Sequence, residues 1–244
     1  MPQTTGGGYW SASRAPRHSL TLALPLILLY ETLAFALSRE QIGAVRNGAD
    51  VLLKSLFLAL GGRHGVAVFG VALFTIGSFL VIRDIRKNGA IRPGLLGVML
   101  LEAAALAAAL GWVVSLLTTL VLSGRMPGLM QASGGSLASF DLPTQLMISL
   151  GAGLYEELLF RVLLVGALAW GARQLLGLRP FVAGLLAAVA GAGIFSAFHY
   201  IGEYGDTWSL ASFTFRAIAG LIFSGLYLLR GFGITAWCHA LYDV

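Results

Sequence analysis

The chain has 244 residues, of which 57% are hydrophobic and only 11% are charged. Soluble domains carry about 25% charged residues, so this composition excludes an ordinary soluble protein and indicates that lipid is the solvent. The net charge of +5 does not indicate a nucleic-acid partner, because the basic residues flank apolar stretches and do not line one face. The single cysteine, Cys238, excludes an internal disulfide and a cysteine-based metal site.

Apolar stretches of helical length follow one another along almost the whole chain. Residues 1–19 are predicted to form a flexible tail, and the stretch over 20–37 is too long for a signal-peptide core and is interpreted as the first span. Further apolar stretches cover residues 65–82, 95–122, 142–172, 181–200, 213–229 and 231–244. Because lipid cannot satisfy an unpaired backbone, the sequence predicts an all-α polytopic membrane protein.

One helix in this series is expected to be different. The segment over residues 49–60 is short and carries Asp50 and Lys54, which predicts an interfacial or re-entrant helix. With it, the chain is expected to hold about seven to eight transmembrane or re-entrant helices, with the site inside the bundle.

Basic residues predict the orientation in the membrane. They gather before the first span, over residues 83–92 and 173–179, and at Arg230, which lie in alternate connections. The positive-inside rule then places the N-terminus in the cytoplasm and the Lys- and Arg-poor connections over 123–141 and 202–212 outside. Three arginines of the first outer connection argue against this orientation: Arg39, Arg46 and Arg63.

Three charged residues lie within the apolar run 142–172, namely Glu156, Glu157 and Arg161. A charge at mid-helix depth costs about 2.5 to 3.5 kcal/mol on insertion scales and usually marks a functional site. Glu157 and Arg161 are spaced to pair along the helix, either for function or only to fix helix packing. Glu156 is rotated from Glu157 by about 100° in an α-helix and has no opposite charge one turn away, so its partner is expected from another helix.

Two histidines in predicted membrane segments are the candidate partners. His199 ends an apolar run, and His239 is followed at i+4 by Asp243. A carboxylate and an imidazole together can activate water for attack on an amide, which we predict for Glu156 and His199. His239, with Asp243 either protonated or orienting the imidazole, is then available to support the oxyanion. The same residues also fit a proton relay in a transporter.

These motifs resemble those of the CAAX-protease and bacteriocin-processing (CPBP, or Abi) family of membrane peptidases. They are Glu-Glu-x-x-x-Arg at 156–161, Phe-x-x-x-His at 195–199, His-x-x-x-Asp at 239–243, and a helix over 215–227 with Gly220, Gly225 and Tyr227. The resemblance implies a glutamate-type intramembrane endopeptidase in which Glu156 and His199 activate water. It further implies that His239 and Asp243 support the oxyanion, and that Glu157 and Arg161 orient the site.

The resemblance leaves two chemical questions open. Many members have Asn at the position of Asp243, and Asn donates a hydrogen bond that an ionised Asp cannot, so Asp243 alternatively orients His239. A zinc-dependent peptidase is a second alternative, with Glu156, His199 and His239 as ligands. The chain has no His-Glu-x-x-His motif, and the prediction is that no cofactor is required.

The predicted organisation is one membrane domain. After the tail over 1–19, N-terminal transmembrane helices cover 20–141 and a CPBP-like catalytic core covers 142–244. The expected partners are the lipid bilayer and a membrane-associated protein or peptide substrate, with no nucleic acid. The Ala-, Gly-, Leu- and Arg-rich composition indicates a bacterial inner membrane protein, and a bacterial processing peptidase is favoured over an enzyme acting on prenylated CAAX proteins.

Overall fold

A computed structural model describes residues 8–38, 46–122, 140–202 and 205–244, and every regular element in these ranges is a helix. Five of these helices are long and apolar enough to cross a membrane: α2 (Pro16–Ser38), α4 (Gly65–Asn88), α5 (Pro93–Leu122), α8 (Pro180–Phe198) and α9 (Leu210–Arg230). The prediction of an all-α, polytopic integral membrane protein is therefore confirmed.

The remaining helices are shorter. The segment predicted over 49–60 is α3 (Gly48–Gly61), which continues into the 3₁₀ turn η1 (Gly62–His64). The long run predicted over 142–172 is built from three helices that follow one another directly: α6 (Leu142–Gly151), the π-helix η4 (Ala152–Val165) and α7 (Gly166–Leu176). The chain ends with α10 (Phe232–Tyr242).

The predicted flexible tail over 1–19 is wrong for residues 9–19. These residues form α1 (Tyr9–Arg14) and the first turn of α2. His18 is fully buried, its Nδ1 lies 2.9 Å from Ala12 O, and its Nε2 accepts a hydrogen bond from the backbone of Arg92. The polar composition of this segment suggested disorder, because composition does not show that Arg92, far along the chain, binds one of its polar groups.

The structure does not describe residues 1–7, 39–45, 123–139 and 203–204. Most of the outer connection predicted over 123–141 therefore lies outside the described residues.

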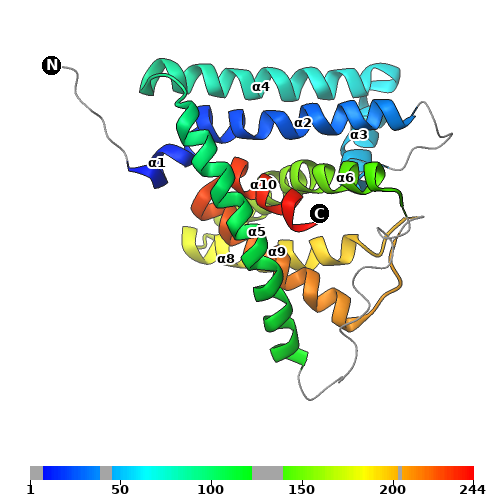
Figure 1. Ribbon diagram of the computed structural model, residues 1–244. Coiled ribbons are helices and arrows are strands. Elements are labelled where there is room, and N and C mark those ends of the chain that lie inside the picture. The colour runs from blue at the N-terminus through cyan, green and yellow to red at the C-terminus, as the bar shows by residue number, and fades with distance from the viewer. Residues whose placement is uncertain (1–7, 39–45, 123–139, 203–204) are drawn as a thin grey trace.

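α10 occupies the middle of the bundle. It packs against α5, η4, α2 and α9, and Figure 1 shows it enclosed by these longer helices. Most of its side chains are buried, among them Ile234, Cys238 and His239. Burial on nearly all sides explains how a helix of 11 residues is stable within the bundle, and it places His239 in the interior.

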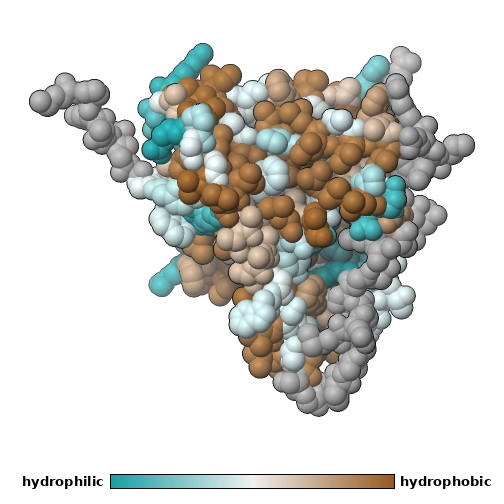
Figure 2. Space-filling view, in the orientation of Figure 1, coloured by the Kyte–Doolittle hydropathy of each residue, from teal (hydrophilic) through white to brown (hydrophobic). Residues whose placement is uncertain are grey.

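The outer face of the bundle is apolar. Along α4, Val71, Phe74 and Phe79 are each at least 60% exposed, and Figure 2 shows a broad hydrophobic surface with hydrophilic side chains gathered towards its ends. Soluble proteins rarely expose apolar patches larger than a few hundred Å². This face is the lipid-facing surface that the composition predicts.

A glycine sets the distance between η4 and α10. A Cβ added to Gly153 would lie 2.3 Å from the carbonyl oxygen of Ala236 and 2.7 Å from Cβ of Ala240. Both distances are shorter than van der Waals contact, so only glycine permits this approach. The contact brings the carboxylates that follow Gly153 against His239.

We therefore expect Gly153→Ala to destabilise the protein by about 1 to 3 kcal/mol, because the added methyl group overpacks the contact between the two helices. Thermal unfolding in detergent measures the effect. Gly184→Ala is the matched control, since a Cβ at Gly184 in α8 meets nothing within 4 Å, and its Tm is expected to stay close to the native value. Equal unfolding temperatures for the two variants would contradict the close-contact account.

Candidate active site

The candidate site is built on the π-helical segment η4. This segment makes i→i+5 hydrogen bonds, a rare geometry that occurs mostly as single turns and frequently at functional sites. It carries Glu156, Glu157 and Arg161, whose exposed fractions are 7%, 0% and 1%. A π-helix has more residues per turn than an α-helix. The rotation from Glu156 to Glu157 about the helix axis is therefore smaller than the value of about 100° for an α-helix.

Two side chains, Arg161 and His239, bind Glu157 at the same carboxylate oxygen. Its Oε1 lies 3.1 Å from Nη1 of Arg161 and 2.7 Å from Nδ1 of His239. The i,i+4 ion pair expected from the sequence is present. An ionised carboxylate only accepts hydrogen bonds, so Nδ1 of His239 carries the proton. The other ring nitrogen, Nε2, is therefore the atom that faces the rest of the site.

Aromatic rings enclose Arg161 and His239. The guanidinium of Arg161 lies 4.4 Å from the ring centre of Phe195 and 5.5 Å from that of Phe223, which places it in cation–π contact with both rings. Phe223 also stacks on His239 with ring centres 4.4 Å apart. None of the three guanidinium nitrogens of Arg161 has a hydrogen-bond partner among the described residues, so rings and Glu157 together stabilise this charge.

Glu156 is bonded at one oxygen and unbonded at the other. Its Oε1 accepts a hydrogen bond of 2.8 Å from Nδ2 of Asn47, a residue that precedes α3. Its Oε2 is buried without a hydrogen-bond partner in the described part of the chain and lies 4.0 Å from Nε2 of His239. Glu156 thus contacts Asn47, which caps α3, at one oxygen and lies near His239 of α10 at the other.

His199 stands at the C-terminal end of α8 with one nitrogen committed. Its Nδ1 lies 2.9 Å from the carbonyl oxygen of Phe195, which only accepts, so Nδ1 donates and Nε2 keeps its lone pair in the neutral ring. His199 and Glu156 interact electrostatically across the site. The backbone N–H of Asp206 donates to His199 O at 2.9 Å, and Asp206 pairs with Arg216 of α9.

Asp243 lies against His239. Its Oδ2 is 3.5 Å from Nε2 of His239, and the hydroxyl of Ser149 in α6 donates to its backbone carbonyl. The structure thus brings all six predicted residues into one interior cluster: Glu156, Glu157, Arg161, His199, His239 and Asp243. Among the described residues, no group of three or more His, Cys, Asp or Glu side chains is arranged as a metal site.

Sequence reasoning missed Asn47 and Phe223. Asn47 has the signature of a helix N-cap, because its Oδ1 accepts hydrogen bonds from the backbone of Ala49 and Asp50. That local signature indicates where α3 begins, but nothing in it links Asn47 to a glutamate 109 positions away. Phe223 is one apolar residue in an apolar helix, and only the fold shows that it stacks on an imidazole.

These features define a polytopic membrane bundle with a buried centre of carboxylates and histidines. Residues 138–244 match the family model described as type II CAAX prenyl endopeptidase, Rce1-like. This match confirms the resemblance to the CPBP family over that part of the chain. It supports an intramembrane endopeptidase in general. No curated protein and no solved structure matches the chain.

The ion pair inside the site generates a stability prediction. Arg161→Met is expected to destabilise the protein by about 3 to 5 kcal/mol, because it leaves the Glu157 carboxylate buried without its compensating charge. The double variant Glu157→Gln/Arg161→Met is expected to recover a large part of that loss, since no unpaired charge remains. Arg86→Met on the exposed end of α4 is the control. Unfolding by heat or denaturant measures all three, and a double variant less stable than Arg161→Met would disprove the pairing.

Proposed function

We propose that the protein is an intramembrane glutamate-type endopeptidase that hydrolyses a peptide bond of a membrane-associated protein or peptide. The observation that carries the proposal is Oε2 of Glu156, a buried carboxylate oxygen left without a hydrogen-bond partner in the described chain. It lies 4.0 Å from Nε2 of His239 and interacts with His199. A buried acceptor of this kind is suited to bind a water molecule.

The proposed mechanism begins with this water. Glu156 Oε2 and His199 Nε2 each accept a hydrogen bond from it, and one of them takes its proton as the oxygen attacks the substrate carbonyl. A fixed pair of acceptors orients the lone pair of the water oxygen towards the carbonyl carbon. The proton is then available for the departing amine, which completes hydrolysis without a covalent intermediate.

The oxyanion that develops during attack requires a donor. His239 is suited to this task when its ring is protonated, because Glu157 at Nδ1 and Asp243 near Nε2 both stabilise the imidazolium. An ionised Asp243 has no hydrogen to donate. Its position against His239 therefore supports the role of orienting and charging His239, in preference to binding the oxyanion itself.

The distribution of charge supports one orientation in the membrane. The Arg17–Asp84 ion pair joins the N-terminal end of α2 to the C-terminal end of α4, and Arg230 at the end of α9 pairs with Glu102 in the first third of α5. The basic segments around these residues thus lie at one end of the bundle. We place this end in the cytoplasm by the positive-inside rule, in a bacterial inner membrane.

The substrate is expected to be a membrane-associated polypeptide. The matching family model is named for prenylated CAAX proteins, while the bacterial character of the composition favours a processing peptidase acting on leader peptides or membrane-anchored tails. Both classes of substrate present an extended segment close to the bilayer, and both belong in the first assay.

The test is cleavage of such peptides by the protein reconstituted in liposomes. Glu156→Gln and His199→Gln are each expected to reduce the cleavage rate by about 100-fold or more, the range typical for loss of a general base. His64→Gln, which changes an exposed histidine, is expected to retain the native rate. A zinc chelator is expected to leave cleavage unchanged.

Three results would contradict the mechanism. Cleavage that the chelator abolishes and zinc restores would replace the glutamate mechanism by a metal mechanism. Full activity of Glu156→Gln would remove the glutamate from the reaction, and proton transport by the native protein without any cleavage would favour the relay.

A further inference from the structure

The first turn of α3 reaches into the candidate site through Asn47. This side chain is 4% exposed and donates from Nδ2 to Oε1 of Glu156 at 2.8 Å. The contact joins the N-terminal part of the chain to the segment matched by the family model, residues 138–244. Asn47 lies outside every motif by which the site was predicted.

Capping of α3 fixes which end of the Asn47 amide faces the glutamate. Oδ1 accepts from the backbone N–H groups of Ala49 at 2.9 Å and Asp50 at 3.4 Å. A reversed amide would lose both cap bonds and set an oxygen against the Glu156 carboxylate. The NH₂ group is therefore held towards Glu156 by the requirements of the helix itself.

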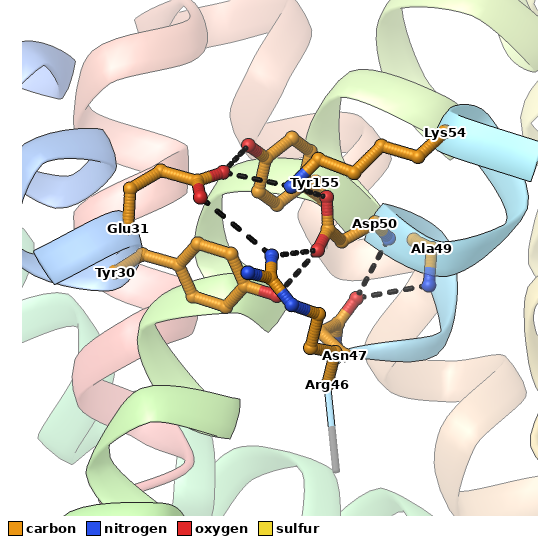
Figure 3. Close-up of polar contacts among 8 residues, drawn as sticks. All are labelled: Tyr30, Glu31, Arg46, Asn47, Ala49, Asp50, Lys54 and Tyr155. Atoms are coloured by element: carbon orange, nitrogen blue, oxygen red, sulfur yellow. Dashed lines mark hydrogen bonds and ion pairs between the residues drawn. The ribbon is translucent and has the colours of Figure 1, made fainter. Parts of the chain in front are cut away.

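A second network holds α3 in place. Asp50 is fully buried, accepts from the hydroxyl of Tyr30 at 2.7 Å, and pairs with Arg46 at 3.0 Å and Lys54 at 2.6 Å. Figure 3 shows these side chains converging between α2, α3 and η4. Because Asp50 has three partners, the helix turn that carries Asn47 has little freedom to move.

The same network also reaches η4. Glu31 of α2 accepts a hydrogen bond of 2.8 Å from Lys54 and one of 2.7 Å from the hydroxyl of Tyr155, as Figure 3 shows. Tyr155 directly precedes Glu156. Tyr155 thus links the backbone of Glu156 to the network around Asp50 and Glu31. Asn47 links the side chain of Glu156 to the same network.

We propose that Asn47 is a positioning residue for Glu156, an inference that rests on the proposed function. Its hydrogen bond holds Oε1, turns Oε2 towards the histidines, and favours the ionised carboxylate that acts as a base. The other charged or titratable groups around Glu156 are His199 at the end of α8, His239 and Asp243 of α10 and its end, and Glu157 and Arg161 of η4. Near Asn47, Arg46 precedes α3 and pairs with Asp50 and Glu31, and Asp50 also pairs with Lys54.

Two substitutions separate positioning from helix capping. Ser and Asp are both good N-cap residues, so Asn47→Ser and Asn47→Asp keep the cap of α3. Asn47→Ser loses the amide donor, and Asn47→Asp replaces it with a carboxylate of the same shape facing Glu156. Asn88→Asp is the matched control, because Asn88 also donates to a carboxylate, that of Asp84, at the far end of α4.

Cleavage in liposomes is measured against pH for all four proteins. Asn47→Ser is expected to lower the rate about tenfold or more, as for loss of a hydrogen bond to a charged group. Asn47→Asp is expected to lower it further at neutral pH and to move the acidic limb of the profile to higher pH, because two adjacent carboxylates retain a proton. Asn88→Asp is expected to match the native profile. Native rates and profiles in both Asn47 variants would reduce Asn47 to a helix cap and overturn the proposal.

A second measurement does not depend on cleavage. Dicyclohexylcarbodiimide modifies protonated carboxyl groups in apolar surroundings, and mass spectrometry of the Glu156 peptide reports its extent against pH. Asn47→Asp is expected to show modification up to a higher pH than the native protein and Asn88→Asp. An unchanged labelling curve overturns the proposal. A shifted curve in a protein that cleaves nothing supports the coupling of Asn47 to Glu156 and counts against the peptidase function alone.

Discussion

Two adjacent carboxylates inside a lipid-facing helix bundle impose the constraint on which the rest of the structure depends. Charges removed from water are costly unless they are paired or hydrogen-bonded, and Glu156 and Glu157 are both buried. Glu157 receives Arg161 and His239, while Glu156 receives Asn47 at one oxygen only. The elements that supply these partners, α3, η4 and α10, are shorter than the five spanning helices, and most of η4 and α10 is buried among them. Each carboxylate is thus bound at Oε1, Glu157 by an arginine and an imidazole and Glu156 by a neutral amide, while both Oε2 atoms are buried without a hydrogen-bond partner among the described residues.

The two glutamates differ in the kind of group that binds them. Glu157 is saturated at Oε1 by an arginine and an imidazole, so it is suited to fixing charge and orientation. Glu156 is bound by a neutral amide and interacts with both histidines, so it is suited to exchange a proton. The two histidines also differ in the partner of Nδ1, which is a carboxylate for His239 and a backbone carbonyl for His199. Protonated His239 is therefore stabilised as an imidazolium, and neutral His199 keeps a lone pair as an acceptor.

The sequence predicted the parts of this site that obey local rules. Charges in apolar runs are few and therefore conspicuous, so Glu156, Glu157, His199 and His239 could be singled out, and helical spacing predicted the pairing of Glu157 with Arg161. Contacts between distant helices obey no such rule, which is why Asn47 and Phe223 were missed. Residues 9–19 were predicted as a flexible tail because their polar composition does not reveal that Arg92 and Asp84 bind them. The π-helical geometry of η4 also left no recognisable pattern in the sequence.

The central claim is that Glu156 and His199 jointly hold the attacking water. A crystal structure of the resting protein in lipid, with diffraction recorded at the zinc absorption edge, tests this claim most directly. The account predicts a water oxygen about 2.6 to 3.2 Å from both Oε2 of Glu156 and Nε2 of His199, with no anomalous peak. A zinc peak at this position, or a direct hydrogen bond between the two side chains that leaves no room for water, would contradict it.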